Sequence, residues 1–435
     1  MFASAWEVTR RAGVAVILVN AVLMYAGFFM LIPFVSLYGT RELGLTAAAV
    51  GLVLATRIVV QQGLTMFGGI VADSVGYKPI LAAGIFIRTI GFTLFAFTHD
   101  FTSLLLAAVV AALGGALFEA THKAALASFV PPRERAIAFS LVSTVGRIGT
   151  MLGPLIAVAL LPIGFATLSL VSAACYVVAF TATVLFLPAT RAMSKEADGE
   201  AASQRRGGWA EAVQVIPAMF RLVWADKPFV VFTALTAGYW FIFSQIFLTL
   251  PLYVSYLSGS DNAVGSLLAV NSAFALVAQY PIIAWVGRRA AALPIIIGGC
   301  GVMTIGLGLF SLGTGIPANG DAGLFVAVLS LPVILYALGD LLVQPTLSAI
   351  TSDLARPEAL GSYFGFSSFG IALGGGIGNA LGGWLFDQSR LAGLPNGPWY
   401  LYSGLAALLA LAFYGYGRVS RASLAQRMSE GSSSG

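Results

Sequence analysis

Five ionisable side chains lie within long apolar runs of this chain, where charge is costly. They are Arg57, Arg88, Glu119, Arg147 and Asp340. Ionisable residues inside membrane spans mark ion or substrate pathways by default. Burial away from water favours the neutral form of a carboxyl group, so Glu119 and Asp340 are candidates to carry a proton between the two sides. Arginine stays protonated in any such site, so Arg57, Arg88 and Arg147 are assigned to pairing or substrate contact instead.

Each of these assignments has a structural alternative. Glu119 has His122 and Lys123 at i+3 and i+4 on its own helix face, so a static ion pair also explains it. The three arginines are equally explained as packing charges whose donors are satisfied by backbone carbonyls. If two or more of them line a cavity, it is electropositive when Glu119 is protonated. That excess argues against a substrate that must be cationic and favours neutral, zwitterionic or acidic compounds.

Polar stripes and aromatic residues extend the set of cavity candidates. Side chains at helical spacing share a face in two places, Arg57–Gln61–Thr65 and Ser140–Thr144–Arg147. Aromatic residues that could form an adaptable apolar pocket, or merely face lipid or pack, are Tyr25, Phe28, Phe29, Tyr239, Trp240 and Phe243. We expect the substrate cavity to include Arg57, Gln61, Arg88, Arg147, Tyr25, Tyr239, Phe243 and Gln344.

The composition shows what kind of element must position these side chains. Only 9% of the residues are charged and 58% are hydrophobic, whereas a soluble domain has about 25% charged residues. A soluble enzyme, a nucleic-acid-binding protein and a disordered protein are therefore excluded for the whole chain. Cys175 and Cys300 both lie in apolar runs, which gives no indication of a disulfide framework or a metal site.

The apolar runs predict an all-α membrane protein with twelve transmembrane helices. The predicted spans are 12–38, 46–72, 79–98, 102–127, 136–161, 164–188, 228–257, 262–286, 291–313, 322–349, 360–386 and 398–418. On the side of the termini we count eighteen lysines and arginines, against two on the opposite side, Arg41 and Arg390. This bias predicts that both termini are cytoplasmic, in what we expect to be a bacterial inner membrane.

The chain divides into two halves of six spans. We expect an N-terminal bundle at 1–188, a cytoplasmic linker at 189–227, a C-terminal bundle at 228–420 and a tail at 421–435. Residues 191–208 are polar and predict a flexible connection. Residues 209–224 are amphipathic and fit either an interfacial helix or an ordinary linker helix.

The two halves are sequence repeats. A shift of 225 residues places Ala112-Leu113-Gly114 on Ala337-Leu338-Gly339, and Glu119 on Gln344, one helical turn after Asp340. Parallel repeats predict two bundles related by a pseudo-two-fold axis, with a substrate site between them. Glycines at every fourth position predict close helix contacts in the eleventh span, at Gly370, Gly374, Gly378 and Gly382.

Two motifs carry a resemblance to a known family. The segment Gly69-Ile-Val-Ala-Asp73-Ser-Val-Gly76-Tyr-Lys78 resembles the loop 2–3 signature of the major facilitator superfamily, although Ser74 and Tyr77 replace basic residues of that signature. Gly149-x-x-x-Gly153-Pro154 resembles the antiporter motif of the same family. Finer resemblance, to drug:proton antiporters of the MdtH type, is carried by Arg57-x-x-x-Gln61-Gln62-Gly63, Phe67-Gly68-Gly69, Lys78-Pro79, Arg88-x-x-Gly91-Phe92 and Leu113-Gly-Gly-x-Leu-Phe-Glu119.

The resemblance implies a function and a gate. The function is export of small amphipathic compounds or drugs in exchange for protons, by alternating access of the two bundles. Asp73 is implied to latch the cytoplasmic side, with Lys78 and Arg133 as partners. The implied partners are a small-molecule substrate, protons and membrane lipids, with no nucleic acid. No cofactor or metal is expected. We expect the protein to be a monomer.

Other functions remain open on the sequence. The exported compound could be a specific acidic or zwitterionic metabolite or siderophore, and proton-coupled import is a further alternative, which the antiporter motif disfavours. A membrane enzyme is disfavoured, because the chain has only two histidines, His99 and His122, and neither an HExxH nor a plausible GxSxG motif.

Overall fold

Long apolar helices build the protein, as expected for segments whose backbone groups must all be satisfied without water. The computed structural model describes residues 9, 12–131, 134–188, 221, 223–286, 292–316, 322–355 and 360–432. Within these ranges the α-helices are α2 (Ala12–Arg41), α3 (Ala47–Val75), α4 (Tyr77–Phe95), α5 (Phe101–Phe129), α6 (Arg135–Leu160), α7 (Phe165–Phe186), α9 (Lys227–Ser244), α10 (Thr249–Ser258), α11 (Asp261–Val286), α12 (Ala292–Leu309), α13 (Ala322–Leu354), α14 (Leu360–Leu391) and α15 (Gly397–Ser432).

The twelve predicted spans are confirmed. Each coincides with a stretch that is long and apolar enough to cross a membrane. The ends agree within about five residues, except that the second and eighth stretches end earlier than predicted, at Thr65 and Gln279. Most of the predicted linker, 189–220 and 222, lies outside the described residues, so neither interpretation of 209–224 is tested.

The seventh span differs from its prediction, because it consists of two helices, α9 and α10, instead of one. Gln245, at the break, donates from its side-chain amide to the carbonyls of Phe241 and Gly378, at 2.8 and 2.9 Å. Its amide oxygen accepts from the Thr249 hydroxyl at 2.7 Å. A buried amide thus takes part of the hydrogen bonding that the broken helix gives up. The sequence carries a signal of this break in Pro251, in the first turn of α10, because proline cannot donate a hydrogen bond to the Phe247 carbonyl.

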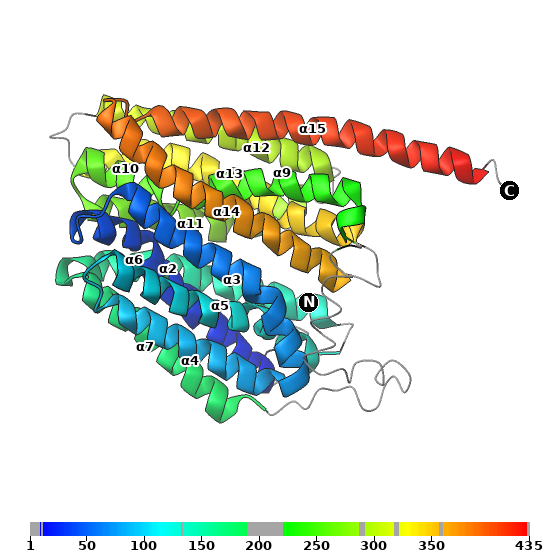
Figure 1. The fold of residues 1–435 in the computed structure, drawn as a ribbon, viewed down its shortest axis with the longest axis horizontal. Coiled ribbons are helices and arrows are strands. Elements are labelled where there is room, and N and C mark those ends of the chain that lie inside the picture. The colour runs from blue at the N-terminus through cyan, green and yellow to red at the C-terminus, as the bar shows by residue number, and fades with distance from the viewer. Residues whose placement is uncertain are drawn as a thin grey trace.

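The helices form two six-span bundles with the same internal packing. In the N-terminal bundle, α4 packs against α5 and α7, and α2 packs against α6. In the C-terminal bundle, α12 packs against α13 and α15, and α9 packs against α14. Figure 1 shows the two bundles side by side, blue to bluish green below and bright green to red above. The pairing confirms the predicted two-bundle architecture.

Glycine faces bring these helices into close contact. A Cβ atom at Gly378 would lie 2.7 Å from the Phe241 carbonyl oxygen of α9, and one at Gly153 would lie 2.8 Å from the Ala26 carbonyl oxygen of α2. Such distances leave no room for a side chain, which is the property of small-residue helix contacts. The predicted glycine stripe of the eleventh span therefore packs against α9, and Gly149 and Gly153 pack α6 against α2 in the equivalent way.

The two bundles touch on one side of the molecule, which we call the distal side because it is opposite the chain termini (Figure 1). There the Ala48 amide of α3 donates to Asp387 Oδ2 of α14 at 2.8 Å. Gly51 of α3 faces the Asn379 carbonyl of α14 so closely that an added Cβ would collide with it.

Toward the other side, which we call the terminal side, α6 exposes Ser140, Ser143 and Thr144. Exposed hydroxyls within a span favour a water-filled space over lipid. We infer that the bundles meet distally and that the space between them opens toward the termini.

Candidate functional site

Glu119 lies on α5 with three polar groups around its carboxylate. The side-chain amides of Gln61 and Gln62 on α3 donate to Glu119 Oε2 at 3.4 and 3.3 Å. Lys123 forms an ion pair with Oε1 at 3.5 Å, and the side chains of Lys123 and Glu119 are 66% and 31% exposed. An exposed pair at this distance contributes little and breaks readily. Glu119 is therefore held by weak partners and stays accessible.

The alternative partner of Glu119, His122, is engaged elsewhere. Its ring nitrogen Nε2 lies 3.2 Å from the carbonyl oxygen of Ile17 on α2, and the side chain is buried. Of the two ion pairs considered from the sequence, the structure thus forms the one with Lys123. The pairing does not by itself decide between a static and a proton-carrying role.

Arg57 and Arg88 share one aromatic ring. Their guanidinium carbons lie 5.0 and 5.1 Å from the centroid of Phe28 on α2. Arg88 also lies 5.6 Å from the ring of Phe92 and 5.5 Å from that of Tyr176. These are cation–π distances, so aromatic faces rather than carboxylates surround both cations in the described part of the chain.

A glutamine connects this arginine pair to the acid. Arg57 Nη1 donates to Gln61 Oε1 at 3.1 Å, and Gln61 Nε2 donates to Glu119. The predicted face of Arg57 and Gln61 therefore points toward α5 and joins Glu119 through one amide. Gly115 of α5 makes this possible, since a Cβ there would lie 2.8 Å from Gln61 Oε1 and 2.9 Å from Arg88 Nη1.

In the C-terminal bundle Asp340 has a different environment. The buried Tyr239 hydroxyl on α9 donates to Asp340 Oδ1. Tyr239 is therefore a buried hydrogen-bond partner of Asp340, and in this state its side chain is not exposed to a cavity. Gln344, one turn further along α13, is half-buried, and its carbonyl accepts from Ser348. The two predicted acids are therefore not equivalent, because Glu119 meets amides and a lysine, and Asp340 meets a phenol.

Aromatic residues connect the two bundles near their middle. Phe243 lies 5.5 Å from Phe247, which lies 5.7 Å from Phe29 of α2. Tyr25, one turn before Phe29, is 44% exposed. Phe243 thus lies beside the interface between the bundles. That Tyr25, Phe243 and Arg147 line a substrate cavity stays a prediction.

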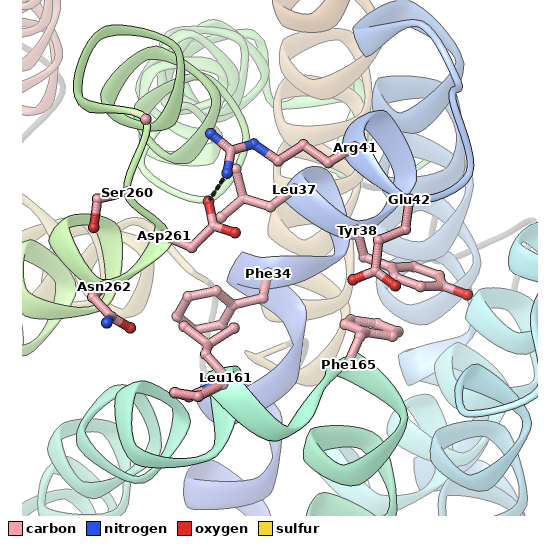
Figure 2. Close-up of a pocket in the computed structure, with 12 residues that line it drawn as sticks. Phe34, Leu37, Tyr38, Arg41, Glu42, Leu161, Phe165, Ser260, Asp261 and Asn262 are labelled. Carbon is pink, nitrogen blue, oxygen red and sulfur yellow. Dashed lines mark ion pairs between the residues drawn. The ribbon is translucent and has the colours of Figure 1, made fainter.

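On the distal side a salt bridge joins the bundles beside a cavity (Figure 2). Arg41 Nη1, at the end of α2, lies 2.9 Å from Asp261 Oδ1, at the start of α11. Arg41 Nη2 donates to the Ser255 carbonyl at 2.9 Å, and the Ser255 hydroxyl donates to Asp261 at 2.9 Å. The adjoining cavity measures about 340 Å³ and includes Glu42, whose pKa is raised by burial and by the charge of Asp261.

Breaking this salt bridge is expected to loosen the distal closure. In a background without Cys175 and Cys300, a cysteine at Leu37, which lines the cavity, reports access by its rate of thiol labelling. Arg41→Gln or Asp261→Asn should raise that rate up to about fivefold, because partly exposed pairs contribute about 0.2–1 kcal/mol. The charge exchange Arg41→Asp with Asp261→Arg should restore slow labelling. Equal labelling rates in the parent cysteine protein, the two single variants and the charge-exchange variant would show that the pair does not hold the bundles together.

Comparison with known proteins places the fold in a family. The sequence profile of the Major Facilitator Superfamily matches residues 17–339. The multidrug resistance protein MdtH of Photorhabdus laumondii is 32% identical over 404 residues, covering 92% of this chain and 94% of the relative. The MdtH of Edwardsiella ictaluri is 32% identical over 403 residues, covering 93% of each. The chain belongs to the major facilitator superfamily. It is therefore an integral membrane protein of a transporter superfamily, which confirms the family resemblance seen in its motifs.

Two solved transporter structures share the fold. A variant of the nucleoside transporter NupG superposes with a TM-score of 0.76 at 14% identity, covering 93% of this chain and 99% of that chain. A POT family transporter in complex with a thioalcohol conjugated peptide gives a TM-score of 0.75 at 14% identity, with coverage of 93% and 96%. At such identity the likeness concerns the fold alone.

The superfamily's loop 2–3 motif lies at the turn from α3 to α4. Gly69 and Asp73 belong to α3, Gly76 separates the helices with φ of 107°, and Lys78 lies in the first turn of α4. A residue with a Cβ would be strained at that φ, which explains Gly76. The side chain of Asp73 and all of Arg133 lie outside the described residues, so the latch remains a prediction.

The superfamily's antiporter motif has a structural role here. Gly149 and Gly153 face the backbone of α2, and Pro154 lies inside α6, which continues without interruption to Leu160. The motif therefore sets the distance between α6, which carries Arg147, and α2, which carries Tyr25.

Sequence reasoning missed several residues of this superfamily member. Gln62 and Gly115 occur in motif stretches, but nothing in the sequence showed that they meet Glu119 and Gln61. Asp387 lies at a span end, where a charge is easily solvated, so the sequence alone does not indicate a role for it. The structure shows a contact there, since this location lets Asp387 accept a hydrogen bond from the first turn of α3 in the other bundle.

Proposed function

We propose that this protein exports small amphipathic compounds across the bacterial inner membrane in exchange for protons. The observation that carries the proposal is Glu119, an acid within a span that is partly exposed and held by two amides and a lysine. Such a group can lose and regain a proton as its surroundings change. The multidrug resistance names of relatives that match over nearly the whole chain support drug efflux.

We infer that the terminal side faces the cytoplasm. The eighteen-to-two distribution of lysine and arginine supports this orientation. In it, the described contacts between the bundles close the outer side, and the exposed hydroxyls of α6 face inward. The arrangement corresponds to a cytoplasm-facing state, from which a compound enters before the bundles rock.

In the proposed cycle Glu119 and Asp340 are the proton-carrying groups. The compound binds between the bundles from the cytoplasm, and the distal contacts of Arg41 and Asp387 then separate. Protons that enter from outside neutralise the acids, and they are released inside after the bundles return. The protein acts as a monomer in contact with membrane lipids, and the proton gradient is its energy source without a resident cofactor.

Reconstituted proteoliposomes test this function. Purified protein is given an imposed pH gradient and a panel of acidic, neutral and cationic amphipathic compounds. We expect compounds to move against the direction of proton flow, with proton movement dependent on compound. Movement in the same direction as protons would instead indicate uptake, and compound-independent behaviour would overturn the proposal.

A further inference from the structure

Two like charges meet at Phe28 without a carboxylate partner among the described side chains. Arg57 and Arg88 approach the same ring at 5.0 and 5.1 Å. The acid on the neighbouring helix α5, Glu119, is bonded to Gln61, Gln62 and Lys123 instead. Two guanidinium groups this close repel each other in a medium of low dielectric constant. The site is therefore electrostatically incomplete.

The arginines also keep unused donors. The Nε atoms of Arg57 and Arg88 are both buried and without a hydrogen-bond partner in the described part of the structure. Arg88 is 6% exposed, whereas Arg57 keeps part of its surface exposed. A buried charged donor without an acceptor is costly. The guanidinium fork matches a carboxylate in two-point geometry, so an anion at Arg57 would offset the repulsion and supply an acceptor for the donors of that arginine.

A negative charge, that of Glu119, is separated from Arg57 by a single side chain, Gln61. Gln61 contacts Arg57 through its oxygen and Glu119 through its nitrogen, so the cationic and anionic groups flank a single amide. Glu119 remains 31% exposed. Aromatic surface for the rest of a ligand is present at Phe28 and at the exposed ring of Tyr25. The cluster thus offers a cation, an anion and apolar surface together.

We propose that Arg57, backed by Arg88, binds the carboxylate of a zwitterionic aromatic compound whose ammonium group binds Glu119. Arg57 is the contact residue, and Arg88 is a positioning residue that acts through Phe28 and the field at Arg57. A proton arriving at Glu119 removes the charge that holds the ammonium group, so compound and proton compete for one acid. This inference rests on the proposed exporter function and names its substrate class.

Matched compounds test the site in proteoliposomes. Several aromatic amino acids, 2-naphthylalanine among them, are each compared with their carboxamide and their N-acetyl derivative. The wild-type protein should transport the zwitterion about tenfold or more better than the carboxamide, since hydrogen bonds to charged groups are strong. Arg57→Gln should abolish this preference while retaining transport of the carboxamide. Arg57→Lys, which keeps the charge without the fork, should retain part of the preference.

Controls separate this site from folding and from the exporter function. Arg390→Gln, at an exposed position on the distal side, should keep the wild-type preference. Arg88→Gln should reduce the preference through a weaker apparent affinity for the zwitterion, with the maximal rate for the carboxamide unchanged. Equal transport of zwitterion and carboxamide by wild type, or an unchanged preference in Arg57→Gln, would overturn the site and leave the exporter function standing. Failure to transport any compound of the panels would overturn both.

Discussion

Glu119→Gln is expected to reduce proton-driven efflux to background. Glutamine has nearly the size of glutamate and can still bond Gln61 and Gln62, but it cannot bind and release a proton at any physiological pH. The bundles should still rock, because no packing contact is lost. Counterflow of a neutral compound, which needs rocking but no net proton movement, should therefore be retained. Both quantities are measurable in the same proteoliposomes, with and without a pH gradient.

The matched control is Asp353→Asn. Asp353 is an exposed acid near the terminal end of α13, and the same acid-to-amide change there should leave both readouts at the wild-type level. Intact proton-driven efflux in Glu119→Gln would move the coupling role away from Glu119, with Asp340 as the next candidate. Loss of counterflow as well would indicate that Glu119 supports the structure of the site.

Gly51→Ala is expected to hinder closure of the distal side. The added methyl group would collide with the backbone carbonyl of Asn379 on α14, which belongs to the other bundle. Overpacking of this kind costs about 1–3 kcal/mol, which disfavours the distally closed state by a factor of about 5–150. The fold of each bundle should survive, because the collision lies between the bundles. A cysteine at Leu37 should label faster and transport should fall by a similar factor.

Gly63→Ala provides the comparison on the same helix. No atom lies within 4 Å of a Cβ at Gly63, and both substitutions gain about 1 kcal/mol of helix propensity. A difference between the two variants therefore reports the contact with Asn379 and not helix stability. Similar labelling and transport in both would show that α3 and α14 separate or adjust at this point without cost.

Much of the architecture follows from the sequence because the membrane restricts it strongly. Apolar runs of about 20 residues have few alternatives to spanning helices, and the repeat relates Ala112-Leu113-Gly114 to Ala337-Leu338-Gly339 in equivalent helices. The close helix contacts could also be predicted, since glycines such as Gly374 and Gly378 recur with helical period. Charge within a span identified Glu119 and Asp340 for the same energetic reason.

The side-chain partners could not be predicted, because they depend on how the helices rotate about their axes. Helical spacing placed Arg57 and Gln61 on one face, but it could not show that Gln61 would bridge Arg57 to Glu119. The joining of Tyr239 to Asp340 spans two helices with no shared motif. Contacts between the bundles, such as Arg41 with Asp261, depend on which side of the molecule is closed, and a sequence encodes both states.

One end of α3 is completed by the opposite bundle. Thr46 accepts a hydrogen bond from the Ala49 amide within its own helix, but the Ala48 amide bonds Asp387 across the interface. Whenever the distal side opens, the Ala48 amide loses Asp387 as its acceptor and is exposed to water, while the Ala49 amide keeps its hydrogen bond to Thr46. The Ala48 amide proton therefore reports on the transport cycle. Its hydrogen–deuterium exchange rate, compared with that of the Ala49 amide, measures the fraction of time that the molecule is open to the outside.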